Sequence, residues 1–488
     1  MEKREIVKRF ADAGFLVHPD VVTYVFENQS SGVIEGIISA LPSGTIVVTP
    51  SLVSGMAVQR NDKLSVGLSD IPSVISGREG NSIPLGNPED SVKLFKSRYE
   101  LLSNILKGRV NPIPIEALLR NANHFADKDI SICGMVVSFS TSKNGHRIVE
   151  IDDSTGAISV LFHKDDENFH EAERIVYDEV IGIKGSIRPN PGGRGGMVFV
   201  KQFFRPDIPR QHAPSLSKEP GKVCMISDVH VGSNTFLPDA WERFTCWLEE
   251  HPEIGYLLID GDVVDGIGIY PDQDKELEIK TIFEQYDRVG EMLAELPKHM
   301  QIVLAPGNHD AVRGAEPQPA LPEEFRSKFR DNVTFVENPA SVSIQGVTIQ
   351  MYHGRSIDDL IKAMPGASYE KSGEVMKAML QRRHMAPIYG QRTPLLSTEP
   401  DHLVINKIPD IFQTGHVHIS DIIRYNGVLG VNAGTWQSQT SFQKEMDINP
   451  TPAEAVVVDL STLEYDHWCF LDKKVQRVII EGGVHKLV

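Results

Sequence analysis

The spacing of apolar and polar residues divides the chain into segments of different character. From about residue 220, short apolar runs alternate with amphipathic stretches, a pattern typical of a buried sheet flanked by helices. Each run ends directly on a polar cluster, and the runs are residues 223–226, 256–259, 302–304, 347–351 and 411–412. Open α/β sheets place functional residues beyond the carboxyl ends of their strands. The pattern therefore predicts an α/β domain over residues 220–488 whose polar clusters share one edge of a sheet.

Residues 111–209 show β-type spacing. Five short runs, separated by turns rich in glycine and asparagine, cover residues 130–138, 147–151, 157–162, 180–187 and 197–200. A helix is expected at Asp166–Ile175, between the third and fourth runs. Five strands with that helix predict a β-barrel that resembles an oligonucleotide-binding fold. Phe139, Phe162 and Phe199 offer faces on which bases could stack, although the pattern also fits a β-domain that only packs against its neighbours.

The N-terminal part has a weaker pattern. Apolar residues recur near helical spacing through residues 1–41, which predicts a small helical module that docks on something else, because about 40 residues make a thin core. Residues 42–110 are expected to be a linker with one helix. Ser, Gly, Asn and Pro dominate this segment up to about residue 90, and Val92–Leu106 then shows an apolar face. The chain as a whole is expected to be multidomain.

Composition narrows the partners and the location. The formal net charge is -17, so a nucleic acid would be held by a local basic patch, by metals or by a partner subunit; an acidic surface that only aids solubility is the alternative. The four cysteines form no Cys-x-x-Cys pair, and the first residues contain no apolar signal core. No apolar run approaches the ~20 residues of a membrane span. We expect a cytoplasmic protein without membrane contact.

The polar clusters contain seven candidate metal ligands, all of them Asp, Asn or His. They are Asp228, His230, Asp262, Asn308, His353, His416 and His418. Mixed nitrogen and oxygen ligands suit two borderline divalent ions that share one carboxylate, and such pairs of ions hydrolyse phosphate esters. A lone Asp-x-His, a lone Gly-Asp or His353 alone is commonly a turn or a core group, whereas Gly-Asn-His-Asp and Gly-His-Val-His are stronger because each places several ligands in one turn. All five in this order, each after an apolar run, favour a metal site over a purely structural role.

Position along the chain indicates how the ligands divide. Asp262 follows a glycine that permits a sharp bend, and its carboxylate is expected to bridge the ions and lower their repulsion. Asp228 and His230 are two residues apart, hence on one side of an extended segment, and are expected to hold one ion together. His416 and His418 have the same spacing, and each could serve a different ion.

His309 and its neighbours add candidate acid–base chemistry. His309 directly follows Asn308, so its side chain is expected to miss the ions and to protonate the leaving oxygen or stabilise charge on the phosphoryl group. Asp310 is expected to orient His309 in an Asp–His pair. A hydroxide held between the ions would then attack phosphorus in line. Asp265 is interpreted as a residue that caps or solvates the following loop.

Together these motifs resemble the calcineurin-like metallophosphoesterase superfamily over roughly residues 220–470. The resemblance implies an α/β metallophosphoesterase β-sandwich flanked by helices, with His309 as the catalytic histidine. It assigns the first ion to Asp228, His230, Asp262 and His418. It assigns the second ion to Asp262, Asn308, His353 and His416.

A finer resemblance is to the small subunits of archaeal family D DNA polymerases. It rests on the β-barrel segment that ends in Phe204–Pro209, on Tyr352–Leu360 around His353, and on Gly434–Thr440 after the last histidine pair. It implies a 3′–5′ proofreading exonuclease that acts on single-stranded 3′ ends of DNA and pairs with a large polymerising subunit. Related eukaryotic B-subunits have lost the ligands, whereas all of them are present here, which favours activity.

Two other functions fit parts of the sequence. A dinuclear-metal phosphatase would use the same ligands but would not need the upstream β-barrel. A mainly scaffolding polymerase subunit would keep the architecture without needing a complete ligand set. Manganese is the expected metal, with iron, zinc or nickel as alternatives, because magnesium prefers all-oxygen octahedral sites.

Overall fold

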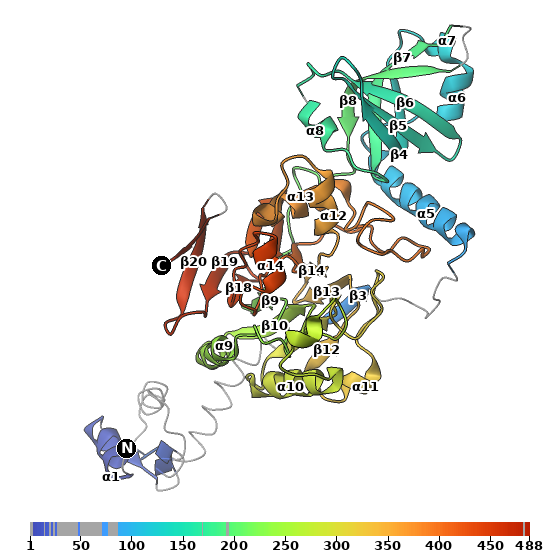
Figure 1. Cartoon of the computed structure of the whole chain (residues 1–488). Helices are drawn as coiled ribbons and strands as arrows, with labels where there is room; N and C mark the ends of the chain where they lie inside the picture. The colour runs from blue at the N-terminus through green and yellow to red at the C-terminus, as the bar shows by residue number, and fades with distance from the viewer. Residues whose placement is uncertain are drawn as a thin grey trace. The chain divides into compact units, whose positions relative to one another are not determined.

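The computed structural model describes most of the chain after residue 85 and short stretches before it. The described residues are 3–13, 15–18, 21–22, 25–26, 47–48, 71–76, 86–167, 169–191, 195–481 and 484–488. The chain divides into two compact units, Met1–Ser69 and Asp70–Val488 (Figure 1). Within the described residues, no helix is both long and apolar enough to cross a membrane.

The first unit contains helix α1 (Lys3–Asp12) and a parallel pair of short strands, β1 (Leu16–Val17) with β2 (Val47–Val48). Its small core consists of Ile6, Phe10, Val21, Val22, Val25 and Val48. The expectation of helices throughout residues 1–41 is wrong at β1, because pairing with a distant strand overrides the local helical spacing. The predicted helical residues 27–41 lie outside the described residues.

In the second unit, five strands form a closed barrel in the order β4-β5-β6-β8-β7. Their bounds are β4 Ile130–Thr141, β5 Arg147–Asp153, β6 Gly156–Phe162, β7 Val180–Pro189 and β8 Gly196–Phe204. Closure leaves no open sheet edge, and branched aliphatic side chains fill the interior. Helix α8 (Phe169–Glu173) lies between β6 and β7 along the chain and is shorter than the expected Asp166–Ile175.

The barrel offers fewer stacking faces than expected. Phe162 is only 4% exposed and belongs to the barrel core, so the prediction of a stacking face is wrong at this residue. Phe139 and Phe199 are half-buried. A guanidinium group covers each ring, with Arg147 at 4.1 Å from the Phe139 centroid and Arg188 at 3.9 Å from that of Phe199. A base would therefore have to displace or stack on an arginine.

Two sheets form the α/β part of this unit, in the orders β12-β11-β10-β9-β18-β19-β20-β21 and β16-β17-β15-β14-β13-β3. The eight-stranded sheet contains β9 Lys222–Ile226, β10 Ile254–Asp260, β11 Gln301–Ala305, β12 Val333–Phe335, β18 Glu454–Asp459, β19 Tyr465–Cys469, β20 Gln476–Glu481 and β21 Val484–Leu487. The six-stranded sheet contains β3 Ser73–Ser76, β13 Ala340–Ile344, β14 Val347–Met351, β15 Ile411–Thr414, β16 Asp421–Tyr425 and β17 Val428–Asn432. The five predicted runs are thus divided between two sheets, with β9, β10 and β11 in one and β14 and β15 in the other.

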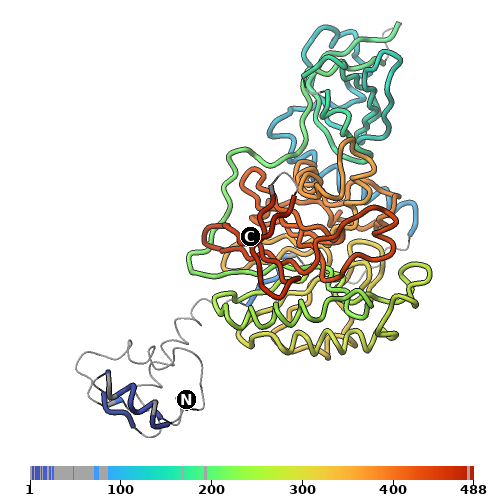
Figure 2. Tube along the Cα trace, turned by 60° about the vertical axis from the view of Figure 1, so that its left-hand side comes forward, coloured from blue at the N-terminus to red at the C-terminus, as the bar shows by residue number. Residues whose placement is uncertain are grey.

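The sheets pack on each other between two pairs of helices. The Gln413 side chain of β15 donates to a carbonyl of β9 at 3.1 Å, and every residue of β10 is buried. Helices α9 (Pro238–Glu250) and α10 (Ile282–Glu295) pack on the eight-stranded sheet. Helices α12 (Ile357–Ala363) and α13 (Ser372–Arg382) pack on the six-stranded sheet (Figure 1 and Figure 2). Shorter helical segments are α6 Ile115–Arg120, α7 Ala122–Phe125, η1 Gln273–Lys275, α11 Glu323–Arg326, η2 Tyr369–Lys371 and α14 Ser441–Glu445.

Part of the expected linker is built into the fold. Strand β3 pairs antiparallel with β13 at the edge of the six-stranded sheet, so the prediction of a linker is wrong for Ser73–Ser76. Helix α5 (Pro88–Leu106) begins before the expected Val92, because Asn87 and Asp90 form a capping box there and Pro88 occupies the first turn. Most of the remaining linker lies outside the described residues.

Candidate dinuclear metal centre

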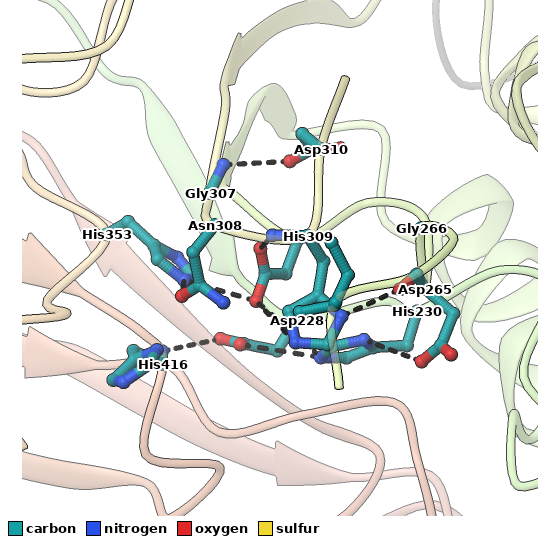
Figure 3. Close-up of polar contacts among 12 residues, drawn as sticks. Asp228, His230, Asp265, Gly266, Gly307, Asn308, His309, Asp310, His353 and His416 are labelled. Carbon is teal, nitrogen blue, oxygen red and sulfur yellow. Dashed lines mark hydrogen bonds and ion pairs between the residues drawn. The ribbon is translucent and has the colours of Figure 1, made fainter. Parts of the chain in front are cut away.

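The polar clusters that follow β9, β10, β11, β14 and β15 converge where these strands end (Figure 3). They carry all of the sequence-predicted ligands, namely Asp228, His230, Asp262, Asn308, His353, His416 and His418. Carboxylate oxygens and imidazole nitrogens of these clusters form three groups, one of which includes His309, and within each group the possible ligand atoms lie within 4.8 Å of one another. Strands from two sheets thus bring together residues that are far apart in sequence.

The backbone is bent sharply at most of these positions. Five of the candidate ligands have positive φ angles, namely Asp228 (51°), His230 (53°), Asp262 (49°), His416 (69°) and His418 (61°). Such left-handed residues cost on the order of 1 kcal/mol each, and they concentrate at functional sites. The expectation that Asp228 and His230 lie on an extended segment is therefore wrong. Gly261 has a φ of 89°, and a Cβ there would approach His353 Nδ1 to 2.5 Å, so glycine is needed for this close approach.

The first group consists of Asp228, His230 and His418. Asp228 Oδ1 lies 3.3 Å from His418 Nε2 and 3.7 Å from His230 Nε2. This oxygen is buried and has no hydrogen-bond partner among the residues that the structure describes. The other oxygen, Oδ2, accepts hydrogen bonds from Ser227 Oγ at 2.6 Å and from the His416 backbone N–H at 2.8 Å. The carboxylate is thus fixed through Oδ2, while Oδ1 faces the imidazole nitrogens of His418 and His230.

The second group consists of Asp262, His353 and His416, with Asn308 beside it. His353 Nε2 lies 3.2 Å from both Asp262 Oδ2 and Asn308 Oδ1. His353 Nδ1 donates to the Asp260 carbonyl at 2.8 Å, which directs Nε2 at the site. His416 Nδ1 is buried and lacks a hydrogen-bond partner within the described part of the chain.

Asp262 lies between the two groups. Its Oδ2 is 3.2 Å from His353 Nε2 in one group and 3.9 Å from His230 Nε2 in the other. Its Oδ1 accepts a hydrogen bond from the His309 backbone N–H at 2.7 Å. This is the position that a bridging carboxylate requires.

Charge at the site is set by pairing of carboxylates with histidines. Burial acts to raise the pKa of Asp262, but neighbouring histidines, His353 foremost, outweigh it and hold that pKa below its usual range. Burial acts to lower the pKa of His230, and hydrogen bonding to carboxylates, Asp228 first, raises it to about 10 instead. The Nε2 atoms of His230 and His418 lie 3.0 Å apart. Ionised carboxylates and facing imidazole nitrogens of this kind suit borderline divalent cations.

Asp265 belongs to the site, contrary to its interpretation as a loop cap. The residue is 1% exposed, and its Oδ1 lies 3.1 Å from His230 Nδ1. Gln437 Nε2 donates to the same oxygen at 3.1 Å, and Gln273 Nε2 donates to Oδ2 at 2.9 Å. Burial acts to raise the pKa of Asp265, but the hydrogen bond with His230 outweighs it and lowers that pKa. A carboxylate so placed orients a metal-binding histidine.

The predicted Asp310–His309 pair is wrong. Asp310 accepts hydrogen bonds from the Gly307 backbone N–H at 2.8 Å and from Tyr286 Oη at 3.0 Å, and burial raises its pKa to about 7. His309 instead contacts the Asp265 carbonyl through Nδ1 at 2.7 Å. Its Nε2 lies 4.0 Å from Asp262 Oδ2, and His309 forms with His230 and Asp262 a third group of side chains that could hold an ion.

Two further contacts to candidate ligands have no counterpart in the sequence interpretation. His416 Nε2 lies 3.5 Å from Asp358 Oδ2, and Tyr369 Oη donates to Asp358 Oδ1 at 2.9 Å. Gln443 Nε2 lies 2.8 Å from His418 Nδ1. A metal-binding imidazole usually has a hydrogen-bond partner at its second nitrogen, so partners of this kind could be expected from the sequence. Spacing along the chain does not identify which residues they are.

Comparison with known families assigns the two parts of this unit. A family model for the B-subunit of DNA polymerases alpha and epsilon matches residues 223–420, and a model for the OB-fold nucleic acid binding domain matches residues 130–203. The α/β part that carries the candidate site, with the barrel before it, therefore defines a B-type subunit of a DNA polymerase.

Relatives narrow this class to one family. The DNA polymerase II small subunit of Methanothermobacter thermautotrophicus is 42% identical over 80% of this chain and 82% of that protein, and that of Thermoplasma acidophilum is 37% identical over 94% and 91%. The chain belongs to the family of archaeal DNA polymerase II small subunits, which are the small subunits of family D DNA polymerases. The DNA polymerase II small subunit of Archaeoglobus fulgidus is a further relative, 37% identical over 92% of this chain and 88% of that protein.

Proposed function

We propose that this subunit is a 3′–5′ exonuclease that hydrolyses DNA phosphodiesters with two divalent ions, with manganese as the expected metal, and so proofreads for the polymerase. The observation that carries the proposal is a pair of buried atoms able to bind a metal, Asp228 Oδ1 and His416 Nδ1, that have no hydrogen-bond partner in the described chain. Buried polar atoms are normally paired. Other buried atoms of the described chain also lack a partner, but these two lie in groups of possible ligand atoms that are within 4.8 Å of one another, which supports cation binding there.

The residues present fit two ions. Asp228, His230 and His418 would hold one, and Asn308, His353 and His416 the other, with Asp262 shared; this division supports a calcineurin-like metallophosphoesterase site. When bound, the ions supply an activated water nucleophile and neutralise phosphate oxygens. Nitrogen and oxygen donors favour manganese, iron, zinc or nickel over magnesium.

His309 is the side chain of this protein that would act directly on the reacting phosphate. The Asp265 carbonyl holds its Nδ1, so Nε2 is directed to the space beside Asp262. Because Nδ1 donates its proton to that carbonyl, Nε2 carries a proton only in the imidazolium form, and in that form it would protonate the leaving oxygen or stabilise charge on a phosphoryl oxygen. The backbone N–H of His309 also holds Asp262 in place.

The partners follow from the family and from charge. A small subunit of a DNA polymerase works with a large catalytic subunit, and the barrel supports contact with single-stranded DNA. The net charge of -17 means that most of the DNA backbone is held by that partner or by local cationic groups, since an acidic surface repels phosphate.

The test uses a 3′-mismatched, 5′-labelled oligonucleotide with the full-length chain, alone and with its large subunit, in manganese. Wild type is expected to shorten the strand from its 3′ end. Asp262→Ala and His309→Ala are expected to lose at least about 100-fold in rate, whereas Asp239→Ala, an exposed aspartate on α9, should match wild type. Unchanged rates in the first two variants would refute the site assignment.

Two measurements separate this function from its alternatives. Rapid turnover of phosphoserine peptides without DNA cleavage would identify a phosphatase instead. A mainly scaffolding subunit would bind less than about one ion per chain, because two ions need two complete ligand sets. Metal content measured by mass spectrometry on the purified chain therefore distinguishes an active site from a residual one.

A further inference from the structure

We propose that an apolar rim on two sides of the candidate metal centre binds the unpaired bases at the 3′ end of the substrate strand. The rim consists of Ile267, Ile269, Tyr270, Phe442 and Met446. The inference rests on the proposed exonuclease and goes further. It names the part of the substrate that the protein recognises, and it explains how frayed ends are selected over paired ones.

The first wall is the loop after Asp265. Gly266 has a φ of 75°, and a Cβ there would meet the His309 carbonyl oxygen at 2.4 Å and Ile269 Cγ1 at 3.1 Å, so the loop lies against the backbone of His309. The Tyr270 ring centroid is 6.4 Å from that of the His309 imidazole. The loop therefore borders the place where the reacting phosphate would lie.

This loop is held in place, yet it exposes apolar groups. The Gly266 backbone N–H donates to Gln285 Oε1 at 2.9 Å, and the Ile269 N–H donates to Gln273 Oε1 at 2.9 Å; both glutamines are buried. Even so, Ile267 is 48% exposed and Ile269 is 40% exposed. Exposed apolar side chains grouped beside a site are candidates for a binding surface.

The second wall is α14. Its Gln443 side chain contacts His418 Nδ1 at 2.8 Å, so the helix lies directly beside a candidate ligand. Thr440 caps it by accepting a hydrogen bond from the Gln443 backbone N–H at 3.2 Å. Phe442 and Met446 are one helical turn apart and are 56% and 53% exposed. This pair presents an aromatic ring and a flexible thioether to solvent.

A shared hydrogen bond shows that the walls flank the same centre. Gln437, on the segment that leads into α14, donates from Nε2 to Asp265 Oδ1 at the start of the loop. His309 borders the loop and His418 borders the helix, and the ring centroids of both lie within 4.9 Å of that of His230. A phosphodiester at the metal centre would thus lie near apolar groups of both the loop and α14.

Unpaired bases are the occupant that this arrangement fits. The nucleotides next to a scissile phosphate carry flat apolar faces, and aromatic or aliphatic side chains bind these faces without regard to sequence. In a paired end those faces are covered by stacking within the duplex. The rim therefore lowers the KM of frayed ends and leaves the chemistry at phosphorus unchanged.

The experiment compares two single-stranded oligonucleotides, one with a normal 3′ end and one whose last two residues are abasic, using the full-length chain in manganese. Phe442→Ala and Ile267→Ser are expected to raise the KM for the normal end by at least about fivefold, with kcat little changed. Neither should alter kcat/KM for the abasic end. Phe283→Ala removes a ring of similar exposure (53%) on α10 and should leave both substrates unaffected.

The outcomes separate the rim from the reaction. If the variants lose the same kcat/KM on both substrates, or lose none on either, the rim does not bind the bases. The proposed exonuclease would be unaffected by that result. Cleavage of neither substrate by wild type would overturn the proposed function and the rim together. Native-gel mobility and thermal midpoints equal to wild type for Phe442→Ala and Ile267→Ser exclude misfolding as the cause of a change in KM.

Discussion

Replacing Asp265 by alanine tests whether a residue outside the candidate ligand set controls metal affinity. Its carboxylate contacts three side chains, those of His230, Gln273 and Gln437. The contact with His230 Nδ1 fixes the ring so that Nε2 faces the site. Without that acceptor, His230 can rotate or change tautomer, and the site loses its preset geometry.

The size of the effect follows from burial and from the number of donors. Loss of such a carboxylate partner lowers metal affinity about 10- to 100-fold, or about 1.4–2.7 kcal/mol. The upper end is expected, because Asp265 is 1% exposed and its removal leaves buried donors unsatisfied. Asp265→Asn should fall between wild type and alanine, since it keeps an oxygen for His230 but removes the charge.

Calorimetric titration of metal-free protein with manganese measures this directly. The Kd should rise from wild type to Asp265→Asn to Asp265→Ala, and Asp239→Ala should match wild type. Exonuclease activity of Asp265→Ala should recover at saturating manganese, whereas that of Asp262→Ala should not. Equal manganese Kd values for Asp265→Ala and Asp239→Ala would refute the reasoning.

Three further predictions concern stability and chemistry. Arg98→Ala should lower the free energy of unfolding by about 3–5 kcal/mol, because Arg98 and Asp401 are buried 2.7 Å apart. Arg120→Ala, which removes an exposed ion pair, should lower it by under about 1 kcal/mol. Guanidinium chloride titration of both variants measures the difference. Burial and Arg98 lower the pKa of His384 to about 4, so the unfolded chain binds an extra proton between about pH 6.5 and 4. This contribution to stability is fully present above that window and is lost as the pH falls through it. In His384→Gln, the urea midpoint should therefore depend less on pH within the window. His309→Ala should retain both ions by mass spectrometry while kcat falls about 10²- to 10⁴-fold; loss of an ion would instead make His309 a ligand.

Contiguous apolar runs were sufficient to locate the strands that carry the site. Residues 256–259, for example, form part of β10, which is buried on both faces. Such a strand is a continuous apolar run without alternating polar residues, so it is easily recognised in the sequence. Strand β3 could not be predicted in this way. Its four residues, Ser73–Ser76, lie in a Ser- and Gly-rich segment, and their strand conformation depends on pairing with β13, far along the chain.

Motif spacing identified the residues that converge at the candidate site, but not the residues that hold them in place. Sequence adjacency suggested that Asp310 would hold His309, yet neighbouring side chains diverge, and Asp310 bonds to Tyr286 instead. The partner of His309 is a backbone carbonyl, which every residue possesses and no sequence marks. Asp265 acts on His230 because tertiary folding places β9 beside β10. The left-handed turns at these ligands also depend on that close packing.

Each candidate ion would take ligands from loops of both sheets. Asp228 and His230 follow β9 of one sheet, whereas His418 follows β15 of the other. A cation bound there would act as a cross-link between the layers of the sandwich. The melting temperature should therefore fall when a chelator removes the ions and recover when the ions are added back.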